Sequence, residues 1–144
     1  MEVAMGFLGK LLGLEGKLPY LASDTNAAKN LESMKGPLEE LTKKVTDKME
    51  VVPADDGAYV FIGKPPKSFG MAWIEEGKVY NFKTLSEEKA VPQQQIVKMV
   101  DALAEAYKKS HSENRFSAEV GDKIVTVTPS KDLAREVRNI IGNA

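Results

Sequence analysis

The chain contains no cysteine. The absence of cysteine excludes disulfide bonds, thiolate zinc sites, iron–sulfur clusters and cysteine nucleophiles. Small secreted proteins often depend on disulfides, so a chain without them is more typical of a reducing compartment. A chain of 144 residues can bury a full-sized core without cross-links. We therefore expect a cytoplasmic protein.

Acidic and basic residues nearly balance, since the chain has 20 basic and 21 acidic residues. Proteins that bind nucleic acids usually carry a basic surface, so we expect no nucleic-acid partner. The chain also lacks the run of about 20 apolar residues that a membrane-spanning helix needs. Its apolar beginning is interrupted by Lys10, Glu15 and Lys17 and has no cationic lead-in, so we expect no signal peptide.

Residues typical of enzyme active sites are scarce. The one histidine, His111, ends a predicted helix, where a cation is expected without any catalytic or metal-binding role. Carboxylates occur as neighbours in turns, at Asp55–Asp56, Glu75–Glu76 and Glu87–Glu88, and no spacing assigns one as acid and another as base. We therefore predict a non-enzymatic protein with no catalytic residue, metal site or cofactor.

The longest amphipathic stretch runs from Pro92 to His111. Its apolar residues recur at spacings of three and four, as in a helix packed against a sheet and a second element: Ile96, Val97, Met99, Val100, Leu103, Ala104 and Tyr107. Capping residues and apolar stripes predict three more helices, from Asp24 or Thr25 to about Lys35, from Pro37 to about Glu50, and from Ser130 to Gly142. A turn is predicted from Pro53 to Gly57.

Five strands are predicted, at Ala58–Ile62, Met71–Glu75, Lys78–Lys83, Arg115–Val120 and Lys123–Thr128. Two-residue turns at Glu76–Gly77 and Gly121–Asp122 would pair Trp73 with Tyr80, Met71 with Phe82 and Ala118 with Val125. Adjacent hairpins are typical of an antiparallel sheet with helices mainly on one face. We predict a single α+β domain over residues 23–144 with the element order αβββαββα, preceded by an amphipathic arm at residues 1–22.

This order of elements, from Asp24 to Gly142, resembles that of the type III secretion chaperones. The roadblock and profilin-like regulatory domains are similar in having a central antiparallel sheet with helices. The resemblance implies a protein-binding, adaptor or chaperone-like module that acts as a homodimer, and it assigns no role to any residue.

The predicted hairpins place large apolar side chains on one face of the sheet: Tyr59, Phe61, Met71, Trp73, Tyr80 and Phe82. Large exposed apolar patches mark interfaces, so these are candidate partner-binding residues. The alternative is that the N-terminal helices fold over this face and make it core.

Two further segments are candidates for binding. A proline-rich loop contains candidate anion-binding residues, Lys64, Lys67 and Ser68. The loop does not match a Walker motif. The alternative is that it is a simple exposed connection between strands. Near the N-terminus, an amphipathic segment could dock on a membrane or a partner through Phe7, Leu8, Leu11 and Leu12, or could pack on its own domain. We therefore expect a homodimeric protein-binding module, with a domain that binds a small anionic ligand or a peripheral membrane protein as alternatives.

Overall fold

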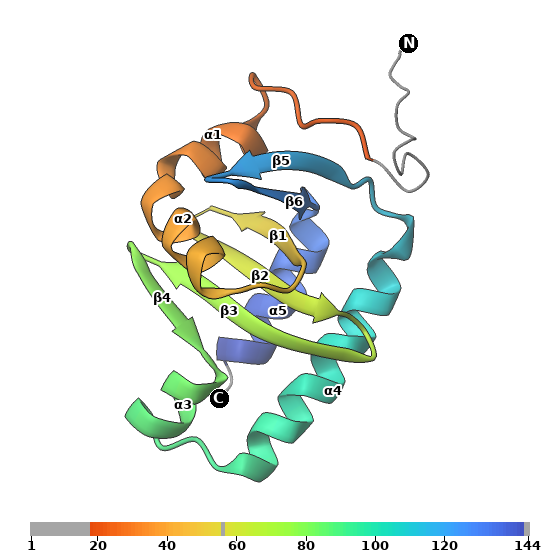
Figure 1. Ribbon diagram of the computed structural model, residues 1–144. Coiled ribbons are helices and arrows are strands. Elements are labelled where there is room, and N and C mark those ends of the chain that lie inside the picture. The colour runs from red at the N-terminus through yellow and green to blue at the C-terminus, as the bar shows by residue number, and fades with distance from the viewer. Residues whose placement is uncertain (1–17, 56, 143–144) are drawn as a thin grey trace.

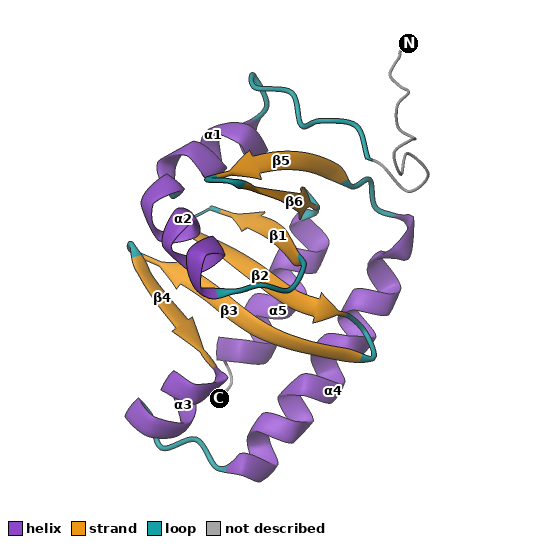
Figure 2. Cartoon of the chain, in the orientation of Figure 1, coloured by secondary structure: helices purple, strands orange, loops and turns teal. Residues whose placement is uncertain are grey.

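A six-stranded sheet separates two layers of helices (Figures 1 and 2). The computed structural model describes residues 18–55 and 57–142. The elements in chain order are α1 (Asn26–Ser33), α2 (Lys35–Lys44), β1 (Met49–Ala54), β2 (Gly57–Lys64), β3 (Ser68–Glu75), β4 (Lys78–Asn81), α3 (Phe82–Glu88), α4 (Gln93–Lys109), a 3₁₀ turn (Ser110–Ser112), β5 (Phe116–Val120), β6 (Lys123–Val127) and α5 (Lys131–Gly142). The strands lie in the order β4-β3-β2-β1-β6-β5.

The α+β class is confirmed, but three details of the predicted architecture are wrong. The sheet is mixed, because β1 and β6 run parallel and pair Glu50 with Thr126. It has six strands, because Met49–Ala54 forms a strand where we predicted the end of a helix and a turn. Helices cover both faces, with α1 and α2 on one side and α3, α4 and α5 on the other. The element order behind the resemblance therefore omits β1 and α3.

Strand β1 contains a proline, and its position in the sheet explains why the strand tolerates it. The Gly63 N–H donates to the Lys48 carbonyl at 2.9 Å, so alternate residues from Lys48 onward bond to β2. Pro53 is not one of these alternate residues, so its nitrogen points away from β2 and toward β6. There the strand-to-strand pairing ends at Val51 with Val127, so the missing N–H costs no hydrogen bond.

Both predicted hairpin registers are confirmed, since Trp73 pairs with Tyr80 and Ala118 with Val125. The predicted pairing of Met71 with Phe82 is wrong, because β4 ends at Asn81. The Asn81 side chain accepts a hydrogen bond from the Thr84 N–H, and the Asn81 N–H donates to the Thr84 hydroxyl, both at 2.9 Å. This capping box starts α3, and the chain leaves the sheet there.

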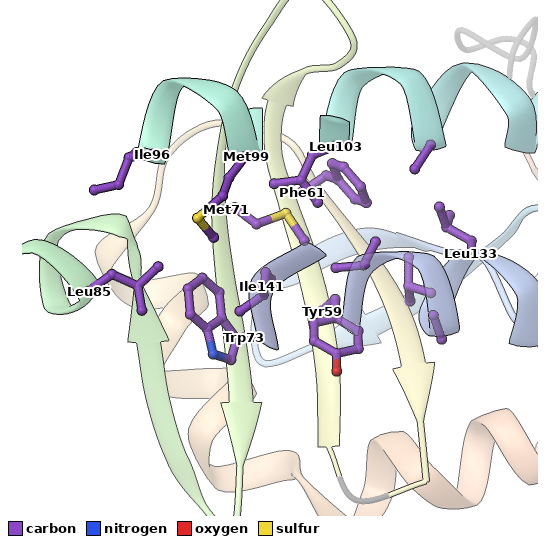
Figure 3. Close-up of a cluster of buried hydrophobic side chains, with 14 of the residues drawn as sticks. Tyr59, Phe61, Met71, Trp73, Leu85, Ile96, Met99, Leu103, Leu133 and Ile141 are labelled. Carbon is purple, nitrogen blue, oxygen red and sulfur yellow. The ribbon is translucent and has the colours of Figure 1, made fainter. Parts of the chain in front are cut away.

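The aromatic face of the sheet is core. Tyr59, Phe61, Met71 and Trp73 have exposed fractions of 6%, 0%, 2% and 3%, and Figure 3 shows them in one cluster with Leu85, Ile96, Met99, Leu103, Leu133 and Ile141. The covering helices are α3, α4 and α5. The N-terminal helices α1 and α2 instead pack on the opposite face, through Leu31, Met34, Leu38 and Leu41. The patch that we considered for partner binding is therefore not exposed at these four residues.

The chain segment before α1 lies along the outer edge of β5. The Leu21 N–H donates to the Ser117 carbonyl at 2.9 Å, and the Ser117 N–H donates to the Pro19 carbonyl at 2.8 Å. Tyr20 thereby forms a parallel bridge with Ser117. An unpaired strand edge is a template for association with other chains, and here this short segment covers part of it.

Candidate functional site

A cleft of about 410 Å³ lies at the carboxyl ends of the two parallel strands, β1 and β6. It is bounded by α1, by the end of β1 and by the first turns of α5, so it spans the end of the sheet from one helical layer to the other. Ligands in open sheets commonly bind beyond the carboxyl ends of parallel strands. Small-molecule pockets usually measure about 300 to 1,000 Å³, so this cleft has a suitable size.

The connection from β6 to α5 forms the floor of the cleft. Pro129 stops the strand, and the Ser130 hydroxyl accepts a hydrogen bond from the Leu133 N–H at 3.1 Å. Ser130 is buried and acts as the N-cap that we predicted for this helix. The helix therefore starts at Lys131, and its positive dipole end lies at the cleft.

Three cationic side chains from α5 line the cleft: Lys131, Arg135 and Arg138. Their spacing of four and three residues places them on one side of the helix. Arg135 is paired with Asp132, with 2.9 Å between Nη2 and Oδ1. Within residues 18–55 and 57–142, neither the Lys131 side chain nor the Arg138 side chain has a hydrogen bond or an ion pair. Two positive charges in the cleft are thus without a counter-ion from the described chain.

Acceptor groups line the side of the cleft formed by α1 and β1. The Asn30 Nδ2 donates to the Ala54 carbonyl, which ties α1 to the end of β1. Its Oδ1 is buried and accepts no hydrogen bond from a described residue. Asp55 adds an exposed carboxylate on the same side. The cleft is therefore polarised, with cations on the α5 side and acceptors on the α1–β1 side.

A second group of polar residues, with one cation, Arg115, surrounds Glu50, which is 8% exposed. Its carboxylate accepts hydrogen bonds from the Tyr107 hydroxyl at 2.7 Å, from the Arg115 Nε at 2.8 Å and from the Thr128 hydroxyl at 2.6 Å. Arg115 also donates to the Ser110 hydroxyl at 2.9 Å. None of these residues lines the cleft, and every charge is paired, so we interpret the Glu50 cluster as structural.

The Glu50 cluster predicts a loss of stability in alkali. Burial, together with the hydrogen bond to the Glu50 carboxylate, raises the pKa of Tyr107 to about 12. The phenol of an unfolded chain has a pKa of about 10, so the folded state holds this proton more tightly. The resulting stability is present below about pH 10 and is lost as the pH rises through about 12.

Denaturant unfolding at about pH 9 and about pH 11.5 measures this effect. We expect the free energy of unfolding to fall more steeply in the natural protein than in Tyr107→Phe, which cannot ionise at this position. The two proteins differ at this residue alone, so the difference between their pH profiles reports the Tyr107 hydroxyl. Parallel pH profiles would show that the Tyr107 proton does not contribute.

The predicted anion-binding residues lie far from the cleft. Lys64, Lys67 and Ser68 are exposed at the tip of the β2–β3 hairpin, where the Lys67 N–H donates to the Lys64 carbonyl at 3.1 Å. Strand β2 runs from the cleft end of the sheet at Gly57 to this tip, so the hairpin tip is at the opposite end. The structure brings these three residues together in one turn, but none of them lines the cleft.

The other predicted binding residues also lie outside the cleft or outside the described residues. Tyr80 and Phe82 are half-buried at the margin of the core, and Phe82 lines a groove between α3 and α4 beside Val97, which is 51% exposed. Phe7, Leu8, Leu11 and Leu12 lie outside the described residues. No helix within residues 18–55 and 57–142 combines the length and the apolar character needed to cross a membrane.

The residues of the cleft were not predicted as a site. The cationic stripe on α5 is visible in the sequence as Lys131, Arg135 and Arg138, and Ser130 was identified as a cap. We predicted a turn from Pro53 to Gly57, and that segment instead includes the end of β1. Without β1, no signal placed Asn30 and Asp55 next to α5.

Comparisons of the chain with protein-family models, with curated proteins and with solved structures found no match.

Proposed function

We propose that the protein is a non-enzymatic binding domain that holds a small anionic molecule in the cleft between α1, β1 and α5. The observation that carries this proposal is the pair of cations, Lys131 and Arg138, that line the cleft without a partner among the described residues. Hydrogen bonds between charged groups are roughly twice as strong as neutral ones, so an anion would gain most from these two side chains. The N-terminal end of α5 adds a favourable dipole.

The composition of the cleft favours binding over catalysis. Its described lining contains cations, two asparagine amides, one serine and one carboxylate, Asp55, and includes no histidine. General acid–base catalysis usually requires a positioned pair of titratable groups with distinct roles. The lining residues instead supply charge and hydrogen bonds, as in sites that recognise a ligand without changing it.

Thermal unfolding with added inorganic phosphate or pyrophosphate tests the proposal. A ligand at about ten times its dissociation constant stabilises the folded state by about 1.4 kcal/mol, which would raise the midpoint by about 4 °C in a protein of this size. We expect such a rise in the natural protein and its loss in Lys131→Gln combined with Arg138→Gln. Sodium chloride at the same ionic strength controls for general salt effects.

A matched variant, Lys64→Gln combined with Lys67→Gln, removes the same charge from the hairpin tip. We expect it to retain the stabilisation by both anions. If this variant loses the effect and the α5 variant keeps it, the anion binds at the hairpin tip and the proposed site is wrong. If neither anion stabilises the natural protein, the proposal of an anion-binding function is wrong.

Homodimer formation and membrane association stay predictions. Light scattering coupled to size exclusion, applied to the full chain, measures the oligomeric state. Co-sedimentation with liposomes, with and without residues 1–15, measures membrane binding. The groove between α3 and α4 has an exposed apolar surface beside Val97. Substitutions of the buried aromatic residues would not test whether this surface is a dimer interface.

A further inference from the structure

The two sides of the cleft carry opposite charge. On the α5 side, Lys131, Arg135 and Arg138 are all cationic. On the α1–β1 side, the described lining has no lysine or arginine and includes the carboxylate of Asp55. A ligand that carries only negative charge would gain from one side and be repelled by the other.

Among the described residues, no cationic side chain is paired with Asp55. Asp55 forms no hydrogen bond or ion pair within the described part of the chain, and it lies at the exposed end of β1. The buried Oδ1 of Asn30, which also has no donor among these residues, adds partial negative charge on the same side. The α1–β1 side therefore favours a ligand group that carries positive charge and N–H donors.

Building on the proposed function, we infer that the ligand is a small zwitterion, in which a phosphate or carboxylate group binds Lys131 and Arg138 and a primary ammonium group binds Asp55. An ammonium group supplies three donors and a full positive charge, which match a carboxylate and neighbouring amide oxygens. A cleft of about 410 Å³ holds a molecule of this kind. The anionic group supplies the attraction to α5, and the ammonium group supplies the selectivity.

Two probes that differ only in the ammonium group test this inference. Isothermal titration calorimetry compares O-phosphoethanolamine with ethyl phosphate, which presents the same phosphate without the amine. We expect the natural protein to bind O-phosphoethanolamine about fivefold more tightly, as for one partly exposed ion pair. In Asp55→Asn this preference should vanish, while ethyl phosphate should bind as well as before or better, because a repulsive charge is gone.

Asp122→Asn is the matched control. Asp122 is an exposed carboxylate in the β5–β6 turn, which precedes β6 and so lies at the opposite end of the sheet from the cleft. We expect it to leave the preference for O-phosphoethanolamine unchanged. Circular dichroism confirms that each variant is folded before binding is measured.

The outcomes separate this inference from the proposed function. If the natural protein binds both probes equally, the zwitterion inference is overturned and the anion-binding function stands. If Asp55→Asn keeps the preference, the assignment of the ammonium group to Asp55 is overturned. If neither probe binds, the inference and the proposed function both fail.

Discussion

Replacing Trp73 with aspartate is expected to unfold the protein, although our interpretation of the sequence alone would expect this variant to separate a dimer. Trp73 is 3% exposed, and its ring lies 6.4 Å from the Tyr80 ring and 6.3 Å from the Phe82 ring. Loss of a buried aromatic side chain costs about 3 to 5 kcal/mol, and an unpaired buried carboxylate adds to this. Domains of this size are stable by only about 5 to 15 kcal/mol.

Far-UV circular dichroism and urea unfolding measure this outcome. Val79→Asp introduces the same charge on the neighbouring strand β4, where the side chain is 36% exposed. We expect Val79→Asp to remain folded with a change of about 1 kcal/mol or less. A well-folded Trp73→Asp with unchanged unfolding would mean that the aromatic face is a surface, contrary to its position beneath α3, α4 and α5.

Replacing Arg115 with alanine is expected to lower the free energy of unfolding by about 3 to 5 kcal/mol, because it leaves the Glu50 carboxylate buried without a cation. The Arg115 Nε lies 2.8 Å from the Glu50 Oε2, and both side chains are largely buried. Tyr107 and Thr128 would still donate hydrogen bonds to Glu50, but neither neutralises its charge. Urea unfolding at neutral pH measures the effect.

A matched control comes from an exposed ion pair. The Lys109 Nζ lies 3.6 Å from the Glu136 Oε2, and the lysine side chain is 71% exposed. Lys109→Ala should cost less than about 1 kcal/mol, because water screens such pairs. Combining Arg115→Met with Glu50→Gln should recover part of the lost stability, since no buried charge then remains. A cost for Arg115→Ala no greater than that for Lys109→Ala would contradict this account of the Glu50 cluster.

The parts of the fold that could be predicted are those with strong local signals. Helix α4 was recognised because Met99 and Leu103 lie on one apolar face, and both are buried. The β5–β6 hairpin was recognised because glycine at Gly121 suits the first position of a two-residue turn. Glu76–Gly77 is not a preferred turn sequence, yet it adopts the positive φ angles of 52° and 79° that a type I′ turn requires. Capping at Ser130 was likewise readable from neighbouring residues.

Other parts were not predicted, most of them because they depend on contacts between distant segments. Strand β1 accommodates Pro53 only because β6 no longer pairs beside it, and this cannot be read from the residues around Pro53. The capping box between Asn81 and Thr84 was a local signal that we overlooked, since the apolar Phe82 favoured continuing the strand. The parallel pairing of β1 with β6 and the face that each helix covers also depend on contacts between distant segments, and neither has a signature in the sequence.

The candidate cleft illustrates the same limit. Its residues come from α1, from the end of β1 and from the start of α5, which are far apart in the chain. A stripe of cations such as Lys131, Arg135 and Arg138 is usually the solvated face of a helix. Only the position of Asn30 and Asp55 beside that stripe makes it one side of a cleft.

The parallel pairing of β1 with β6 also has a consequence for how the protein folds. Strands β1 to β4 form one unit of sequence neighbours and the β5–β6 hairpin forms another, and in the described part of the sheet the two units pair through β1 and β6, at Glu50 with Thr126 and Val51 with Val127. Joining them closes a long loop, and non-local pairings of this kind slow folding. The cleft is bounded by the end of β1 from the first unit and by the segment after β6 from the second. A chain in which only one unit has folded has no cleft, so the candidate site forms only when both units have folded and paired.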